Sequence, residues 1–447
     1  MGRRMAVVAA AGVAALLAGV VMPTAASAQP VMKVPCSTPA LVSAISGAAD
    51  GATLDLASTC TYVLTAALPT VAQDLTINGN GSTLRRSTAT GTAAFTILTI
   101  TAGTVTLNLL SFTNGAGAIT VDNLAQLTVT GGEFSRNTAV NGAAINNTGA
   151  TVVQVTDTSF VDNTATEDGG AIYVYTALGN QIIDCSFRGN TAAGSGGAYW
   201  EFSNGSFISG STFRDNKATS GGALFFDDQG TEIAGTEIHD NRATGDGGGI
   251  EDESGGSPVY ITASEITGNR AGGTGGGLDE ESYGLGYITN TTIEDNRAAD
   301  GGGINDGDGT IIEYTSDTIS GNRASGAGGG VNAIVSSLIF TGTTLSGNRA
   351  GGDGGGLYDS TGFGIPFTSF TNSTISSNRA RGLGGGIYNQ GPVDASGTQI
   401  TGNRADGGGG GIYDAGTQAT VTLTDSSPTG NKPDNCEPLG SITGCTG

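Results

Sequence analysis

An asparagine recurs at nearly constant spacing from residue 137 to residue 431, with 25 to 30 residues between successive copies. An apolar residue stands three positions before it in eleven of the twelve copies, and in most copies a glycine run follows it. A period of this length predicts a solenoid, in which each repeat forms one coil stacked on the next. The twelve copies are Asn137, Asn163, Asn190, Asn216, Asn241, Asn269, Asn296, Asn322, Asn348, Asn378, Asn403 and Asn431.

Two further apolar sets keep fixed distances from the asparagine. One set lies eight positions before it, as at Ile208, Ile233 and Ile261, and the other follows the glycine run, as at Ile250 and Leu278. The sets three and eight positions before the asparagine are an odd number of residues apart, so a uniform two-residue alternation cannot bury both. A bend must separate them, and each coil is expected to contain three short inward-facing strands.

This pattern predicts an all-β, single-stranded parallel β-helix of about 14–16 coils. The 78 glycines and the lack of an apolar 3.6-residue period in the repeat disfavour a helical solenoid. The asparagines are expected to form a line along one edge, where each side-chain amide bonds the local backbone and the matching amide one coil away. We expect this asparagine ladder to be structural.

The ends of the chain differ in composition from the repeat. Residues 1–28 have two arginines, an apolar stretch and a final Ala-Ser-Ala, which is typical of a secretory signal peptide. The other predicted units are an N-terminal cap with the first degenerate coil at 29–62, the β-helix at 63–435 and a C-terminal cap at 436–447. A short helix with Pro39 in its first turn is expected in the N-terminal cap.

The five cysteines fit an oxidising exterior. Cys36 and Cys60 flank the first degenerate coil, and Cys436 and Cys445 enclose a short C-terminal loop, so two local disulfides are expected. Cys185 occupies a position where other coils carry serine or threonine, and a buried free thiol is expected there.

The formal net charge of −22 favours solubility and argues against binding of nucleic acid through its phosphates. After removal of the leader, no apolar run has the length of a membrane span. We therefore expect a secreted, extracellular protein without a transmembrane segment, and a monomer.

Phe-x-x-Asn followed by Gly-Gly-Ala and an aliphatic residue occurs at 160–163 with 169–172, and again at 213–216 with 221–224. This pairing resembles the repeats of polymorphic outer-membrane proteins of the chlamydial type. More widely, residues 36–435 resemble bacterial secreted right-handed parallel β-helix proteins with a pectin-lyase-like fold. The resemblance implies a right-handed β-helix and an extracellular role in surface contact.

An acidic and aromatic row follows the glycine runs and is expected to face outward. Carboxylates on adjacent coils would lie about 5 Å apart, which suits Ca²⁺ and is also the spacing used by retaining glycosidases. No cofactor is expected to be required, but Ca²⁺ is possible, with Glu251, Asp279 and Asp306 as candidate ligands. The candidates for contact with a sugar are Trp200, Glu201, Asp228, Glu280, Tyr358, Tyr388 and Tyr413. The competing interpretation is that these side chains cap turns or are solvated.

A cationic row follows the asparagines directly. Such a line could track an anionic polysaccharide, or it could be a solvated ladder paired locally with acids such as Asp240 and Asp295. Its members are Arg242, Arg270, Arg297, Arg323, Arg349, Arg379 and Arg404, with Lys217 before them and Lys432 after them.

Two functions from different classes remain open. One is a non-catalytic, adhesin-like protein that contacts a cell surface or an extracellular polysaccharide. The alternative is a polysaccharide lyase or glycoside hydrolase that uses the acidic row. The Gly-His-Gly and Arg-x-Pro-x-x-Arg signatures of polygalacturonases and pectate lyases are absent, and the only histidine is His239 at a turn, so the binding function is favoured.

Overall fold

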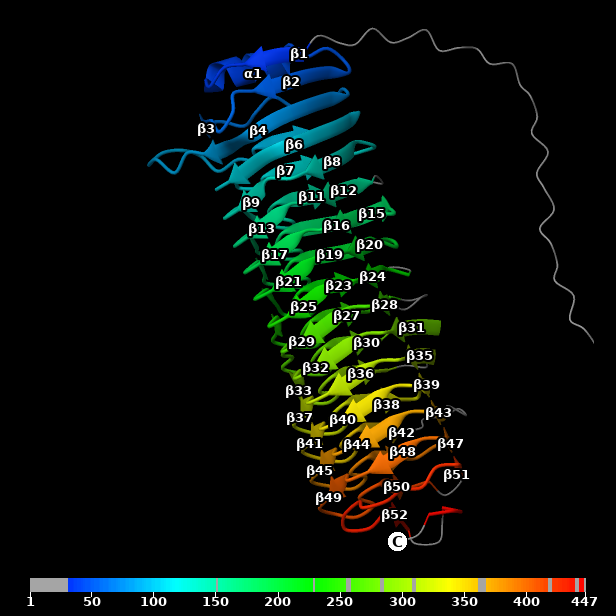
Figure 1. Cartoon of the computed structure of the whole chain (residues 1–447). Helices are drawn as coiled ribbons and strands as arrows, with labels where there is room; N and C mark the ends of the chain where they lie inside the picture. The colour runs from blue at the N-terminus through cyan, green and yellow to red at the C-terminus, as the bar shows by residue number, and fades with distance from the viewer. Residues whose placement is uncertain are drawn as a thin grey trace, which may run out of the picture.

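The computed structural model describes residues 31–149, 152–227, 230–254, 259–281, 285–307, 311–360, 367–416, 420–438 and 442–445. These residues form one elongated stack of coils, with the N-terminal cap at one end and the C-terminal segment at the other (Figure 1). The predicted leader, residues 1–28, lies outside the described residues. The strand pairings are parallel throughout this part of the chain, as in successive coils of a β-helix.

One coil shows the path of the chain. It passes through β31 (Leu285–Thr289), β32 (Thr292–Glu294), β33 (Arg297–Ala298) and β34 (Ile304–Asp306). The first two belong to a 28-stranded sheet, the third to a five-stranded sheet and the fourth to a 14-stranded sheet. The three predicted strands are present, and the two-residue strand β33 is an addition that the sequence analysis did not predict.

Residues in the left-handed region make the corners of this coil. Asn290 and Asp295 have φ of 51° and 55°, and Gly301 has φ of 60°. Asparagine, aspartate and glycine accept this conformation most readily. The bend expected between the two apolar sets is therefore located at Asn290.

The 28-stranded sheet supplies two walls of the rod. At its N-terminal end lie β1 (Val31–Val34), β2 (Ala52–Leu56), β3 (Thr61–Leu64), β4 (Leu75–Arg86) and β6 (Thr104–Thr113). The first wall continues through β8 (Gln126–Thr130), β12 (Val153–Thr156), β16 (Gln181–Ile183), β20 (Phe207–Ser209), β24 (Glu232–Ala234), β28 (Tyr260–Thr262), β31, β35 (Ile311–Thr315), β39 (Ser337–Thr341), β43 (Thr368–Thr371), β47 (Val393–Ser396) and β51 (Val421–Thr424). The second wall is β9 (Glu133–Ser135), β13 (Ser159–Val161), β17 (Ser186–Arg188), β21 (Thr212–Arg214), β25 (Glu237–His239), β29 (Glu265–Thr267), β32, β36 (Thr318–Ser320), β40 (Thr344–Ser346), β44 (Thr374–Ser376) and β48 (Gln399–Thr401).

The 14-stranded sheet receives one strand from each successive coil, in agreement with the expected coil number. It contains β5 (Leu98–Ile100), β7 (Ile119–Val121), β11 (Ile145–Asn147), β15 (Ile172–Leu178), β19 (Tyr199–Asn204), β23 (Leu224–Phe226), β27 (Ile250–Asp252), β30 (Leu278–Glu280), β34, β38 (Val331–Ile334), β42 (Leu357–Ser360), β46 (Ile387–Asn389), β50 (Ile412–Asp414) and β52 (Cys436–Glu437). The two five-stranded sheets are β10 (Thr138–Ala139), β14 (Thr164–Ala165), β18 (Thr191–Ala192), β22 (Lys217–Ala218) and β26 (Arg242–Ala243), and then β33, β37 (Arg323–Ala324), β41 (Arg349–Ala350), β45 (Arg379–Ala380) and β49 (Arg404–Ala405).

The core is a set of side-chain stacks that run along the rod. Phe134, Phe160, Phe187 and Phe213 lie in register on adjacent coils, with ring centroids 4.5 to 5.1 Å apart. Isoleucines continue the same line, and these residues are fully buried. Because like residues face each other across every coil, the apolar sets read from the sequence are confirmed as the core.

The asparagine ladder is confirmed in detail. The backbone N–H and Nδ2 of Asn296 both donate to Oδ1 of Asn322, at 2.9 and 3.1 Å, and Nδ2 also donates to the carbonyl of Ile266 at 2.8 Å. Asn269 donates to Oδ1 of Asn296 in the same way. Each amide thus satisfies buried backbone groups on its neighbours, which is why the residue repeats.

A second ladder runs beside it, five positions before each asparagine. The backbone N–H of Thr236 donates to Oγ of Ser264 at 3.1 Å, and that of Ser264 donates to Oγ1 of Thr291 at 3.4 Å. Each hydroxyl in turn donates to a carbonyl two residues earlier, as Ser264 does to Thr262 at 2.8 Å. Cys185 stands in this ladder as a buried free thiol whose pKa is raised to about 12 by burial, which confirms that expectation.

Asp317 interrupts the hydroxyl ladder. Its Oδ1 accepts from the backbone N–H of Thr291 at 2.8 Å, but Oδ2 is buried and has no hydrogen-bond partner among the described residues. Burial raises the pKa of Asp317 from 3.8 to about 7, against the lowering effect of its backbone hydrogen bonds. Asp317 therefore does not destabilise the fold below the unfolded pKa near 4, and its destabilising effect grows as the pH rises toward about 7.

Asp317→Thr is expected to stabilise the protein in a pH-dependent manner. Threonine can accept from Thr291 and donate to a backbone carbonyl, as Thr343 does, without a carboxylate to desolvate. The gain should be small at pH 4 and reach about 2–4 kcal/mol above pH 7. Thermal unfolding from pH 4 to 8 measures it, with the exposed Asp394→Thr as the control. A gain that is absent at pH 8, or that is the same at every pH, would contradict this account.

Both ends are closed as expected. Disulfides join Cys36 to Cys60 and Cys436 to Cys445. The N-terminal cap contains α1 (Thr38–Ser46), with proline in its first turn, and Leu41 packs into the core. Among the described residues, no helix is long and apolar enough to cross a membrane.

Candidate functional site

The middle residue of each three-residue strand in the 14-stranded sheet faces outward. In β27, Ile250 belongs to the core and Asp252 is buried on the same side, so Glu251 between them lies on the outer side. Parallel pairing in register carries this arrangement from coil to coil. The outer row consists of Asn146, Tyr173, Trp200, Phe225, Glu251, Asp279, Asn305, Asn332, Tyr358, Tyr388 and Tyr413.

The prediction that the whole acidic row faces outward is wrong for Glu201, Glu280 and Asp306. Their exposed fractions are 0%, 1% and 0%, because each stands two positions after a core residue and therefore points inward. Glu201 and Glu280 are thus not surface contacts for a sugar. The third sugar candidate in the acidic set, Asp228, lies outside the described residues.

The inward carboxyls form a stack inside the rod. Asp252, Glu280 and Asp306 are register neighbours on three adjacent coils. Burial raises the pKa of Asp252, although the backbone N–H of Val259 donates to its Oδ2 at 2.8 Å. The hydroxyl of Tyr314 is also fully buried, and burial followed by the charges of Asp306 and Glu280 raises its pKa. The sequence signal for this stack was the two-residue alternation after Ile250.

The three calcium candidates do not converge on one point. Glu251 and Asp279 are outward neighbours, whereas Asp306 lies on the inner side of its strand. Within the described ranges, no group of three or more His, Cys, Asp or Glu side chains has an arrangement that could hold a metal ion.

Glu251 and Asp279 form a carboxyl pair under the glycine turn. Their exposed fractions are 2% and 0%. Asp279 accepts hydrogen bonds from Thr274 Oγ1 and Asn305 Nδ2, both at 2.6 Å, while Oε2 of Glu251 has no hydrogen-bond partner among the described residues. Burial and then the charge of Asp279 raise the pKa of Glu251 to about 11, and burial raises the pKa of Asp279 to about 7. At neutral pH the Glu251 carboxyl is therefore protonated.

An aromatic patch covers β15, β19 and β23 on the outer side of the sheet. Tyr173 and Trp200 stack with ring centroids 4.4 Å apart, and Tyr175 and Phe202 stack at 5.2 Å. Phe225 continues the first stack at 6.1 Å from Trp200. We call these five residues the aromatic patch. Of them the sequence analysis named only Trp200, although the alternation Tyr173-Val174-Tyr175 carried the signal for the outward pair.

A second aromatic stack lies farther along the same outer row. Tyr358 and Tyr388 have ring centroids 4.9 Å apart, and Tyr388 and Tyr413 are 5.7 Å apart. The expected alignment of these three tyrosines with Trp200 is therefore confirmed, and the carboxyl pair lies between the two aromatic groups.

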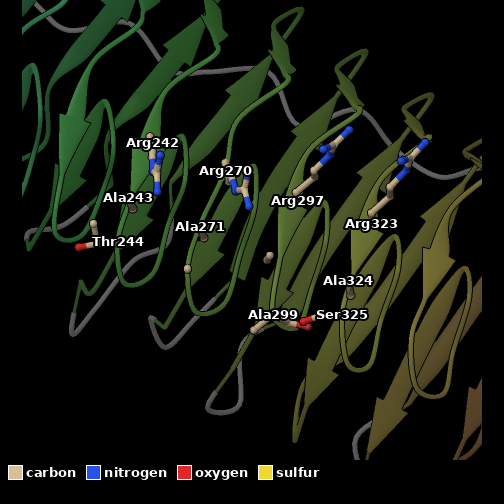
Figure 2. Close-up of a pocket in the computed structure, with 12 residues that line it drawn as sticks. Arg242, Ala243, Thr244, Arg270, Ala271, Arg297, Ala299, Arg323, Ala324 and Ser325 are labelled. Carbon is tan, nitrogen blue, oxygen red and sulfur yellow. Dashed lines mark hydrogen bonds between the residues drawn. The ribbon is translucent and has the colours of Figure 1, made fainter.

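The cationic side chains lie on another edge, where the short strands pair. Arg242 to Arg404 face one another in register on seven consecutive coils, with Lys217 and Lys432 at the two ends. We call this row the arginine edge. It borders an open groove of about 480 Å³ from Arg242 to Arg323 (Figure 2), which continues toward Arg381 as a second hollow of about 350 Å³. Like charges one strand spacing apart repel by about 1 kcal/mol in water and by more where solvent is excluded.

Comparison with known proteins agrees with this architecture. Residues 139–284 match the family described as right handed beta helix region. These residues are a right-handed β-helix. Farther along the β-helix, residues 372–390 and 397–415 match the Chlamydia polymorphic membrane protein repeat. Both matches confirm the resemblances read from the sequence.

Solved structures also resemble the β-helix. The A-module of the mannuronan C-5 epimerase AlgE6 of Azotobacter vinelandii is 12% identical, with 88% of this chain and 95% of that chain covered and a TM-score of 0.34. The PL6 family alginate lyase AlyGC is 12% identical, with 89% and 76% covered and a TM-score of 0.30. Both TM-scores lie below 0.5, so neither similarity is evidence for an activity of this chain. No curated protein matches the sequence at a significant level.

Proposed function

We propose that this protein is a secreted, monomeric, non-catalytic binding protein that contacts an extracellular polysaccharide or a glycan-bearing cell surface. The observation that carries the proposal is the aromatic patch. Two stacked ring pairs stand side by side on β15 and β19, and Tyr175 and Phe202 remain 43% and 40% exposed. Exposed aromatic rings gathered at one place on a soluble protein mark a contact surface.

The geometry of the patch suits a sugar chain. Because the rings of each pair stack on one another, their edges form an apolar surface along the rod, on which the C–H groups of a sugar chain can pack while its hydroxyls stay in water. Successive coils place the ring centroids of the two pairs 4.4 and 5.2 Å apart, close to the length of one sugar unit in a linear chain. A polysaccharide that runs along the rod could therefore meet one ring edge per coil.

The state of the carboxyl pair favours binding without cleavage. Glu251 and Asp279 are buried, and Asp279 is engaged by Thr274 and Asn305. A general acid or nucleophile must reach the substrate within hydrogen-bond distance. The regular coil length leaves these groups beneath the turn rather than in an open cleft.

Secretion and a surface role are supported by two further observations. Both disulfides lie at the ends of the rod, and such bonds persist in oxidising exteriors. The matched Chlamydia repeats belong to proteins described as polymorphic membrane proteins, which is compatible with an adhesin-like role.

The alternative is a polysaccharide lyase or glycoside hydrolase, and one observation favours it. The pKa values of Glu251 and Asp279 are raised to different extents, to about 11 and about 7, and such a separation is found in acid–base pairs. If the protein is such an enzyme, Glu251 and Asp279 would supply two carboxylate ligands for a Ca²⁺ ion.

The test replaces the exposed stacked pair. Tyr175→Ala with Phe202→Ala should weaken retention on a polysaccharide that the wild type binds by about tenfold or more, because two ring contacts of about 1 kcal/mol each are lost. Affinity electrophoresis through gels that contain neutral or acidic polysaccharides measures the effect.

A matched control is available on another wall of the rod. Tyr260 and Tyr287 also stack, at 5.7 Å, and Tyr287 is 37% exposed. Their double alanine variant should retain wild-type binding. Equal loss in both variants, or unchanged retention of the Tyr175 and Phe202 variant, would remove the aromatic patch from the proposed function.

A further inference from the structure

We propose that the arginine edge is a second binding site, which holds a linear acidic polysaccharide along the rod axis with one anionic group near each coil. This site lies apart from the aromatic patch and goes beyond the proposed function. Its ligand is defined by its chemistry, which is a single sugar chain that carries a carboxylate or sulfate at regular intervals.

The backbone holds the cations in a fixed row. Each short strand has two residues, so the alanine points inward and the cation before it points outward. Ala243, Ala350 and Ala380 have exposed fractions of 1%, 5% and 0%, whereas the arginine before each of them is exposed. Figure 2 shows Arg297 and Arg323 extended side by side in one direction, and Arg242 and Arg270 turned the other way. The coil repeat therefore sets the spacing of the backbone positions that carry the cations, close to the length of one sugar unit.

The protein itself does not neutralise most of the row. Asp406 pairs with Arg379 at 3.2 Å and with Arg404 at 3.3 Å. No other ion pair to a member of the arginine edge occurs in the described part of the chain. The five arginines from Arg242 to Arg349 thus repel one another without an ion-pair partner among the described residues, and an external polyanion would reduce this repulsion.

Two of the aspartates that lie close to the row in sequence face other partners. Asp240 lies 3.1 Å from Nδ1 of His239, and Asp215 pairs with Arg214 at 3.3 Å. Asp215, Asp240 and Asp295 have positive φ of 58°, 57° and 55° at the turn, a position that Asn and Asp fill for backbone reasons. Among the described residues, none of these three aspartates forms an ion pair with a member of the arginine edge.

The groove beside the row fits a narrow ligand. Small residues line it, among them Ala271, Gly272, Ala299 and Ser325, so a sugar chain could approach the backbone while the guanidinium groups bind its anions. Arginine offers two parallel N–H donors to a carboxylate or sulfate. The net charge of −22 on the whole chain would repel a wide polyanion such as duplex DNA, which cannot contact the row alone.

The test uses the full secreted protein and defined probes. Affinity electrophoresis with polygalacturonate, chondroitin sulfate, neutral dextran and a DNA duplex, at two salt concentrations, compares the wild type with Arg270→Gln, Arg297→Gln and Arg323→Gln combined. We expect binding to at least one acidic polysaccharide, about 30-fold weaker in the triple variant, with a smaller salt dependence. The thermal midpoint should stay equal or rise, because repulsion is relieved.

A control variant carries the same change in charge away from the edge. Arg136→Gln, Arg188→Gln and Arg214→Gln combined should change binding less than threefold. The Tyr175 and Phe202 double alanine variant should keep its affinity for the acidic probe, which separates this site from the aromatic patch. Absence of acidic polysaccharide binding at low salt, equal loss in both arginine variants, or equal affinity for the DNA duplex would overturn the proposal.

Discussion

Ile293→Asp is expected to abolish cooperative folding of the central coils. Ile293 is fully buried in β32 and stacks in register between Ile266 and Ile319. The substitution removes about 2 kcal/mol of apolar burial and places a carboxyl in the apolar stack between Ile266 and Ile319, which costs several kcal/mol more. Because each coil of a solenoid is stabilised through its neighbours, the defect also weakens the coils on either side.

Thermal and urea unfolding of the secreted protein measure this effect, with Arg297→Ala as the control in the same coil. The exposed arginine should change the free energy of unfolding by less than about 0.5 kcal/mol. Similar midpoints for the two variants would show that the inner and outer faces have been assigned incorrectly.

Asn296→Ala should have the second largest effect, about 3–5 kcal/mol. The side chain accepts from the backbone N–H and Nδ2 of Asn269 and donates to Asn322 and to the carbonyl of Ile266. Alanine leaves these buried groups without partners, and each unsatisfied group costs about 1–3 kcal/mol.

The exposed Glu265→Ala, one coil earlier, is the matched control and should be close to neutral. Hydrogen exchange adds a local readout, since the amide of Asn269 should lose protection in Asn296→Ala. If Asn296→Ala keeps wild-type stability, water or a shift of the backbone must replace the lost hydrogen bonds. That result would contradict the structural role of the asparagines.

The repeat could be predicted from sequence because its signals are local and periodic. The position three before the asparagine is Phe, Ile or Leu in eleven of the twelve copies, and the structure stacks these residues in one line, as at Phe213 and Ile238. Such a set can be recognised without knowledge of distant contacts, since each member packs on a similar apolar residue one coil away.

The acidic positions could not be predicted by the same means. After Ile250, the alternation itself places Asp252 inside, but charged residues are usually exposed, so the whole acidic row was expected to face outward. Asp252 can lie inside because the backbone N–H of Val259 donates a hydrogen bond to its carboxyl. That contact depends on the path of the chain after β27.

The arginine edge shows a similar limit. The regular spacing of the arginines predicted that they form a row, but it did not predict which acidic residues pair with them. Asp240 stands two residues before Arg242 in sequence, yet it occupies a left-handed turn and contacts His239 instead. The short distance in sequence between Asp240 and Arg242 therefore did not predict an ion pair, because the turn points their side chains in different directions.

The central claim is that this rod holds polysaccharide without breaking it. The most direct test incubates the mature protein with each retained polysaccharide, with and without Ca²⁺, and follows both the bound fraction and the chain length by size-exclusion chromatography. The account predicts retention with unchanged chain length, and the same result for Glu251→Gln. Shortened chains or new reducing or unsaturated ends, formed by the wild type and lost in Glu251→Gln, would contradict it and establish the enzymatic alternative.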